Sequence, residues 1–237
     1  MHCIMSQQPV EAPRYWETRS SSRIVLTFHG LGVLPHELAA HSDPEMWIEA
    51  ARFEALLDRL PAGVELTFDD GFLSCLTIAV PALIARNLRA RFFVTRGHLG
   101  LRGYLSERDL HNLIEAGMQI GSHGMRHRPW RRLDYRALVE EIFETKDCLE
   151  QIVQGPVTEA ACPFGAYDRQ TLVALRRAGM RRVYTSDRLP ARLGSWIVPR
   201  YTLRASDALE DWRRIVDRRE PAFPWLRRIK AAVKRWR

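Results

Sequence analysis

Seven short apolar runs, separated by stretches of helical periodicity, constrain the fold of this chain most strongly. Strand candidates lie at 24–28, 64–68, 91–94, 118–120, 159–162, 182–185 and 196–198. Between them, Asp134 looks like an N-cap followed by one apolar helical face up to Ile152, and 44–60 and 106–116 show similar patterns. Seven strands that alternate with helices predict an α/β barrel of parallel strands, and 237 residues suit one domain of this type.

Two adjacent carboxylates, Asp69 and Asp70, follow the buried strand predicted at 64–68. In α/β folds, the carboxyl ends of the strands carry the chemistry. Only one of two adjacent carboxylates can readily bind a single metal ion. The other carboxylate would then lie beside a metal-bound water and could act as a base. The alternative without a functional role is that Asp70 and Gly71 form a turn, because Asp-Gly is among the commonest turn signals.

Two histidines, His123 and His127, follow a second apolar run. Their spacing matches the zinc protease motif His-Glu-x-x-His, but Gly124 stands where that motif needs glutamate, so this interpretation fails. Taken alone, they could be a solvated pair. Combined with a carboxylate, they predict a site for a divalent metal. The same donors occur in non-haem iron oxygenases, although those are antiparallel β folds.

Both motifs resemble those of a known family, the polysaccharide deacetylases with the NodB-homology domain, or carbohydrate esterase family 4. The family's Thr-Phe-Asp-Asp-Gly stands unaltered at 67–71, and its His-(Ser/Thr)-x-x-His stands at 123–127 with glycine in the second place. The resemblance covers about 23–200. It implies a distorted, incomplete (β/α) barrel.

By the same resemblance, Asp69 is the general base, and the metal ligands are Asp70, His123 and His127. The implied metal is zinc, with cobalt, nickel or manganese as alternatives. Three protein ligands leave open positions, where a metal lowers the pKa of bound water.

The third family motif, Arg-x-Pro-Tyr/Phe, appears at 161–164 with Ala161 in place of its arginine. Phe164 is kept, and the resemblance assigns its backbone N–H to the oxyanion. Arg200, at the end of the strand predicted at 196–198, is our candidate for the lost cation, which would hold Asp69 ionised and oriented. The alternative is an ordinary surface arginine.

The family's C-terminal Leu-x-His has no counterpart, because no histidine follows His127. His29 instead ends an apolar strand near the N-terminus, which is similar to the permuted poly-N-acetylglucosamine deacetylases. We therefore expect His29 to be the general acid that protonates the leaving amine. The alternative is a lone histidine that caps a strand end.

The resemblance implies a metal-dependent hydrolase that removes N-acetyl groups from an amino sugar or glycan precursor and releases acetate. A deformylase or another amide or ester hydrolase on the same scaffold is the alternative enzyme. The missing motif arginine and the displaced histidine also leave open a catalytically degenerate carbohydrate-binding protein.

The net charge of +8 lies entirely in 213–237, where ten Arg or Lys residues face two acids, whereas 1–212 holds 26 of each. Leu226, Ile229, Val233 and Trp236 recur at helical spacing among these charges. A basic amphipathic helix is typical of binding to an anionic membrane surface, and packing on the barrel is the alternative. Nucleic acid is disfavoured because no recognition motif accompanies the charge.

These patterns divide the chain into an N-terminal extension (1–22), a catalytic domain (23–212) and a basic tail (213–237). Four cysteines occur singly, so neither a zinc knuckle nor a disulfide framework is indicated. Without an apolar leader or an apolar run long enough for a membrane span, we expect a cytoplasmic protein, peripheral to the inner face of the membrane.

Overall fold

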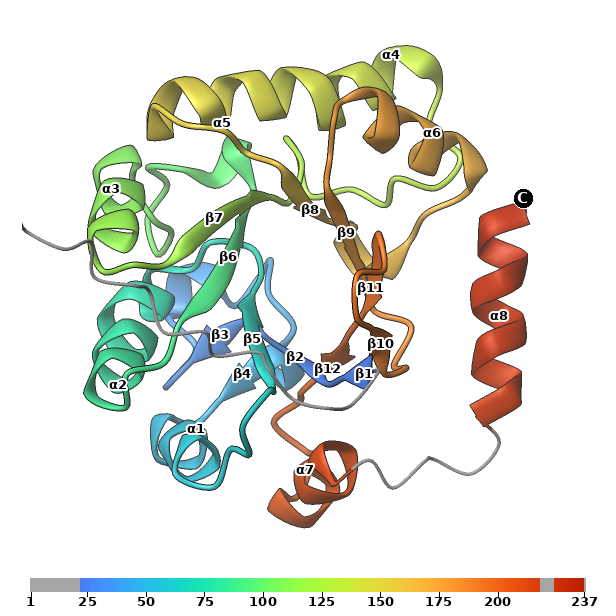
Figure 1. The fold of residues 1–237 in the computed structure, drawn as a ribbon. Helices are drawn as coiled ribbons and strands as arrows, with labels where there is room; N and C mark the ends of the chain where they lie inside the picture. Colours follow the sequence, from blue (N-terminus) through green and yellow to red (C-terminus); the bar gives the residue numbers. More distant parts are fainter. Residues whose placement is uncertain (1–21, 218–223, 237) are drawn as a thin grey trace, which may run out of the picture.

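Eight parallel strands form the core of the computed structural model, which describes residues 22–217 and 224–236. Their order around the sheet is β11, β9, β8, β7, β6, β5, β2 and β12 (Figure 1). The strands are β2 (Val25–Phe28), β5 (Glu65–Phe68), β6 (Ala90–Val94), β7 (Gln119–Ser122), β8 (Glu159–Ala161), β9 (Arg182–Thr185), β11 (Ile197–Pro199) and β12 (Tyr201–Thr202). The seven predicted strands and the parallel barrel are confirmed.

The sheet curves into a barrel because one stretch of chain pairs at both of its edges. Arg200 alone separates β11 from β12. Before it, Pro199 pairs with Thr185 of β9, and after it, Tyr201 pairs with Leu26 of β2. The ring therefore has seven strand positions rather than the eight of a full (β/α) barrel.

Helices surround the barrel on its outside (Figure 1). They are α1 (Ala50–Leu57), α2 (Val80–Ala85), α3 (Glu107–Glu115), α4 (Tyr135–Leu138), α5 (Thr145–Val153), α6 (Arg169–Arg177), α7 (Leu209–Val216) and α8 (Pro224–Trp236). Wider π-helical turns at Cys75–Ala79 and Val139–Glu144 lead into α2 and join α4 to α5. Two small sheets pair β1 (Ser22–Arg23) with β10 (Ala191–Arg192) and β3 (Gly30–Leu31) with β4 (Trp47–Ile48).

Two of the three predicted helices begin and end as expected. The side chain of Asp134 caps α4, and a capping box at Ser106 begins α3, which gives way to Gly117 at a φ of 76°. The helix predicted over 44–60 is wrong in its first part, because α1 begins only at Ala50.

The reason lies in the packing of Trp47, which breaks the helical run. Its indole covers Gly30 so closely that a Cβ on that glycine would lie 2.2 Å from the ring. Pro44–Met46 therefore form one 3-10 turn, and Trp47–Ile48 form β4 beside β3. Burial of the indole overrides the local helical preference.

Alternation along the strands separates two apolar layers. Phe28 and Phe68 point outward and pack on Phe53 of α1, with ring centroids 5.1 and 5.9 Å away. Each fully buried ring of this kind stabilises the fold by roughly 1.5–3 kcal/mol. Inside the barrel lies a smaller buried cluster that includes Val25 and Phe93.

The two ends of the barrel differ. At the amino ends of the strands, Arg91 bonds Glu65 and Glu159 at 3.1 and 2.6 Å, and Arg23 pairs with Glu65. This ion-pair network closes that end. The carboxyl ends of the strands are left for the polar side chains that follow β2, β5 and β7.

The tail contributes two helices to the described structure. α7 runs across the boundary expected between 212 and 213 and buries Trp212. α8 stands beside the barrel (Figure 1). The expected extension lies outside the described residues except for Ser22, and no described helix has the length and apolar character needed to cross a bilayer.

Candidate metal centre and active site

Asp69 follows β5 and is held by Arg200 at the centre of the barrel. The guanidinium donates to both carboxylate oxygens over 2.7 Å each, and it donates further to Thr67 Oγ1 over 3.1 Å. The Arg200 side chain is fully buried, with its guanidinium over the rings of Phe93 and Tyr184. Burial alone would raise the pKa of Asp69, but Arg200 outweighs it and lowers that pKa below its usual range.

Asp70 lies next to the two predicted histidines. Its Oδ1 is 3.0 Å from His127 Nε2 and 3.4 Å from His123 Nε2. The ligand atoms of the three residues all lie within 4.8 Å of one another. Asp70 adopts a left-handed φ of 72°, directly before Gly71 at 80°, and this sharp turn directs the two aspartates differently.

This donor set fits a divalent cation. Among the described residues, Asp70 Oδ1 has no hydrogen-bond partner although it is buried and close to both imidazoles, and a cation would satisfy it. His123 Nδ1 lies 2.8 Å from the carbonyl oxygen of Ala161. That bond fixes the ring so that Nε2 faces Asp70, which is how proteins orient metal-binding histidines.

The electrostatics also suit a cation. Burial would raise the pKa of Asp70, but the two imidazoles hold that pKa well below its usual range. Burial would lower the pKa of His127, but Asp70 outweighs it and raises that pKa. The carboxylate therefore stays ionised, while a cation would compete with a proton on His127.

A buried carboxylate outside this cluster shapes the loop that carries both histidines. Glu141, from the π-helical turn after α4, accepts hydrogen bonds from the backbone N–H of Met125 over 3.0 Å and of Arg126 over 3.2 Å. A Cβ atom added to Gly124 would lie only 2.3 Å from Oε2 of Glu141. Gly124, at a φ of 85°, is therefore required by Glu141, which sequence reasoning did not single out.

His29 directly follows β2 and lies within electrostatic reach of the site. Its Nδ1 is buried and has no hydrogen-bond partner among the described residues. Burial lowers the pKa of His29, against the attraction of Asp70 and Asp69. The structure thus places His29 within the electrostatic influence of Asp69 and Asp70, and its role as the general acid stays a prediction.

Phe164 lies in the 3-10 turn Pro163–Gly165 after β8, with a left-handed φ of 57°. Its exposed ring lies 4.7 Å from that of His127, between centroids. The loop therefore adjoins the His123–His127 cluster, as an oxyanion donor would require. Ala161, in place of the motif arginine, lies in the barrel interior together with Phe93 and Tyr184, the two rings that Arg200 covers.

Two further aromatic side chains, missed by sequence reasoning, line the same region. His98 ends the turn after β6, and its ring lies 4.6 Å from Tyr104 and 6.1 Å from His127. Burial lowers the pKa of His98, and burial together with Asp70 raises the pKa of Tyr104. A polar residue soon after a strand was a usable signal for His98, whereas Tyr104 lies in a loop without such a signal.

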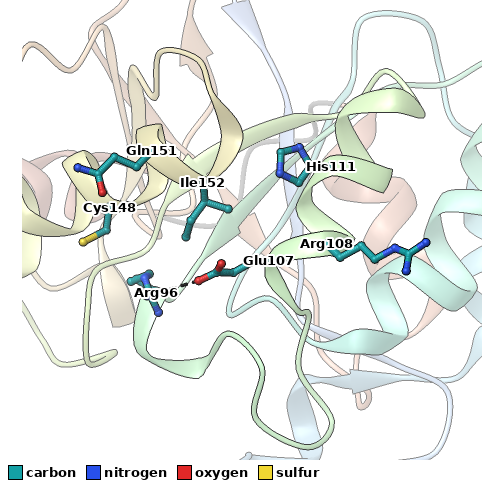
Figure 2. A pocket seen from close by; sticks show the side chains of 7 residues that line it. All are labelled: Arg96, Glu107, Arg108, His111, Cys148, Gln151 and Ile152. Carbon is teal, nitrogen blue, oxygen red and sulfur yellow. Dashed lines mark ion pairs between the residues drawn. The ribbon is translucent and has the colours of Figure 1, made fainter.

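A cavity of about 440 Å³ lies elsewhere, between α3 and α5 (Figure 2). Arg96 and Glu107 face each other there as an ion pair at 3.5 Å, with His111 and Cys148 among the other lining residues. None of the predicted site residues lines this cavity. The site at the carboxyl ends of the strands is therefore separate from it.

A parallel (β/α) barrel that carries an Asp-Asp pair and a His pair at the carboxyl ends of its strands defines the class of this protein. The family model for polysaccharide deacetylase matches residues 59–183, more than half of the chain. The chain belongs to the polysaccharide deacetylase family. The matched region includes Asp69, Asp70, His123, His127 and Phe164, while His29 and Arg200 lie outside it.

Similar proteins agree with this membership. One relative is YxkH of Bacillus subtilis (strain 168), which carries the name of a polysaccharide deacetylase. It is 25% identical to this chain over 124 residues, which make up 52% of this chain and 44% of that protein. The chain thus spans less than half the length of this curated relative.

Two solved structures share the fold. The deacetylase PplD of Streptococcus pyogenes, in complex with acetate, gives a TM-score of 0.71 at 20% identity over 84% of this chain and 99% of that one. IcaB from Ammonifex degensii gives 0.66 at 22% identity, over 84% and 97%.

Proposed function

We propose that this protein is a metal-dependent carbohydrate N-deacetylase, which hydrolyses the acetamide of an amino sugar or glycan precursor. The observation that carries the proposal is the division between the two adjacent aspartates. Asp69 is held by Arg200 and Asp70 adjoins two imidazoles, so one base and one ligand set occur in neighbouring residues. Family membership and the deacetylase PplD, solved with acetate, support the same chemistry.

Asp70, His123 and His127 would hold the cation. Zinc is our choice, and cobalt, nickel and manganese accept the same donors. When bound, such a cation supplies Lewis-acid chemistry, polarising an acyl oxygen and lowering the pKa of water.

Asp69 takes the proton from the attacking water. Its carboxylate is ionised at neutral pH because Arg200 lowers its pKa, and the two-pronged contact fixes the plane of the carboxylate. Arg200 therefore acts through Asp69, in place of the motif arginine absent at Ala161.

The backbone N–H of Phe164 donates to the oxygen of the acetyl group as negative charge develops on it. His29 gives a proton to the nitrogen as the C–N bond breaks. The products are acetate and a free amino sugar, so one water is consumed for each acetamide cleaved.

Acetate release from a panel of N-acetylated sugars, with added metal and with chelator, tests the proposal. We expect release with metal, loss with chelator, and loss in the Asp69→Asn variant. Release of formate from N-formyl sugars alone, or cleavage of esters alone, would assign a different hydrolase. Sugar binding without any turnover, in fully metal-loaded protein, would identify a degenerate binding protein.

A further inference from the structure

Helix α8 presents an apolar face away from the barrel. This face, called the outer face here, consists of Trp225, Leu226, Ile229, Val233 and Trp236, whose side chains are between 42% and 83% exposed. At 100° per residue these positions fall on one side of the helix. Exposed apolar patches of this kind mark interaction surfaces.

The opposite side of α8 packs on the barrel, which settles how the helix is oriented. Ala231 is 3% exposed. Lys234 Nζ donates to Asp187 Oδ1 over 2.8 Å and to the carbonyl oxygen of Gly165 over 3.1 Å, and Arg227 donates to the carbonyl oxygen of Arg188. The packing alternative, with Leu226, Ile229 and Val233 against the barrel, is therefore not the arrangement in the structure.

Charge distinguishes between possible occupants of the outer face. α8 carries five basic residues and no acidic one, in the stretch 213–237 that holds the whole net charge of the protein. Exposed Lys230 borders the outer face. A second copy of the chain would bring two such helices together, with like charges opposed. A surface of negative charge over an apolar layer complements this helix in both respects.

We propose that the outer face of α8 docks on an anionic lipid bilayer. The helix lies in the interface, with the outer face among the acyl chains and the exposed Arg228, Lys230 and Arg235 at the level of the headgroups. Trp225 and Trp236 mark the two ends of the face, and tryptophan favours this interface. Because Lys234 also bonds the Pro163–Gly165 loop, the docked helix holds the carboxyl end of the barrel beside the membrane.

Sedimentation of the full chain with vesicles of phosphatidylglycerol and phosphatidylcholine tests this surface, with phosphatidylcholine alone for comparison. We expect binding to the anionic vesicles that weakens with salt, because exposed charges are screened beyond about 8 Å at physiological ionic strength. A double variant, Ile229→Asn with Val233→Asn, should lower partitioning by about a hundredfold, from the transfer free energy of two aliphatic side chains.

Ile84→Asn is the matched control, because Ile84 on α2 has the same 51% exposure as Ile229. It should leave binding unchanged, and thermal melting should show that all variants are folded. The proposal is overturned if the full chain stays in the supernatant, if the double variant binds normally, or if Ile84→Asn is equally impaired.

Two other occupants would each give a distinct and contrary result. If a second copy of the chain covers the outer face, light scattering without lipid would show a dimer, and the double variant would be monomeric. Binding to vesicles only after deletion of residues 1–21 would show that the chain's own N-terminal segment occupies it.

Discussion

Arg200 contacts Asp69 through two parallel N–H···O bonds of 2.7 Å each, with both side chains buried inside the barrel. A buried carboxylate stays ionised only when neighbouring charges or hydrogen-bond donors offset its loss of hydration. The relationship gives Asp69 two properties, a fixed charge and a fixed orientation.

Replacing Arg200 by glutamine should shift the pH dependence of turnover. Burial would then raise the pKa of Asp69, which must be deprotonated to act as a base, so the acidic limb of the rate profile should move to higher pH. Loss of one partner of a buried pair should also cost about 3–5 kcal/mol of stability. Rates across the pH range and urea unfolding measure the two effects.

The stability change should itself depend on pH. Arg200 lowers the pKa of Asp69 in the folded protein, so the ion pair stabilises above the unfolded pKa, near 3.8, and its contribution fades as pH falls through the folded value. Exposed Arg192→Gln is the control and should alter neither measurement. An unmoved acidic limb in Arg200→Gln would separate Arg200 from the base.

Metal content should distinguish the two aspartates. Asp70→Ala, His123→Ala and His127→Ala should each lose bound metal, whereas Asp69→Asn should keep it and lose turnover. Elemental analysis of the purified variants decides between these roles. If Asp69→Asn loses metal while Asp70→Asn keeps both metal and activity, the two assignments are reversed.

Lowering the pH should release metal from the wild-type protein. At a given metal affinity, the raised pKa of His127 means that a proton competes with the cation at a higher pH than it would on an ordinary histidine. Titration of metal occupancy against pH measures this midpoint. A midpoint that does not move to lower pH when the metal concentration is raised would contradict competition between the proton and the cation at His127.

His29→Ala should lower turnover by about 10²- to 10⁴-fold, the usual contribution of a general acid, with metal retained. An acid must be protonated, so wild-type turnover should fall as pH rises through the pKa of His29. Burial lowers this pKa, which places the limb below the usual 6.5. Near-normal amide hydrolysis in His29→Ala would remove this residue from the mechanism.

Gly124→Ser should be harmful although serine is a residue that the family motif allows there. Glu141 Oε2 occupies the space of the new Cβ, so the substitution should cost about 3 kcal/mol or more, combining a left-handed φ with a displaced buried carboxylate. Thermal melting and metal affinity measure the loss.

Gly100→Ser provides the control for this strain. Its φ of 82° is close to that of Gly124, but in the described part of the chain no atom beyond its two neighbours in sequence lies within 4 Å of its Cβ position. This variant should lose only about 1 kcal/mol and keep its metal affinity. Equal losses at both glycines would show that Glu141 does not constrain the loop.

The barrel could be predicted from sequence because each strand is a short, separate apolar run between helices, and both signals are local. The interval 44–60 shows the limit of such signals. Its helical pattern is real, but Trp47 packs across Gly30, seventeen positions away, and no local pattern reports that contact. The split of the last strand at Arg200 likewise depends on two distant partners, β9 and β2.

The site divides in the same way. Asp69, Asp70, His123 and His127 could be found because they directly follow predicted strands or stand in a family motif. Glu141 and Tyr104 could not, because a helix turn and a loop deliver them to the site from outside the strands. The fold determines their position, and their neighbours in sequence carry no trace of it.

The position of Arg200 between β11 and β12 also has a consequence for protein synthesis. Residue 200 leaves the ribosome long after Asp69, and its backbone joins the strand that pairs with β9 to the strand that pairs with β2. During synthesis, six strands of the large sheet can form while the guanidinium partner of Asp69 is still missing. Under the proposed mechanism, Asp69 can act as a base only after the last strand closes the barrel, so chains that end before Arg200 are expected to be inactive.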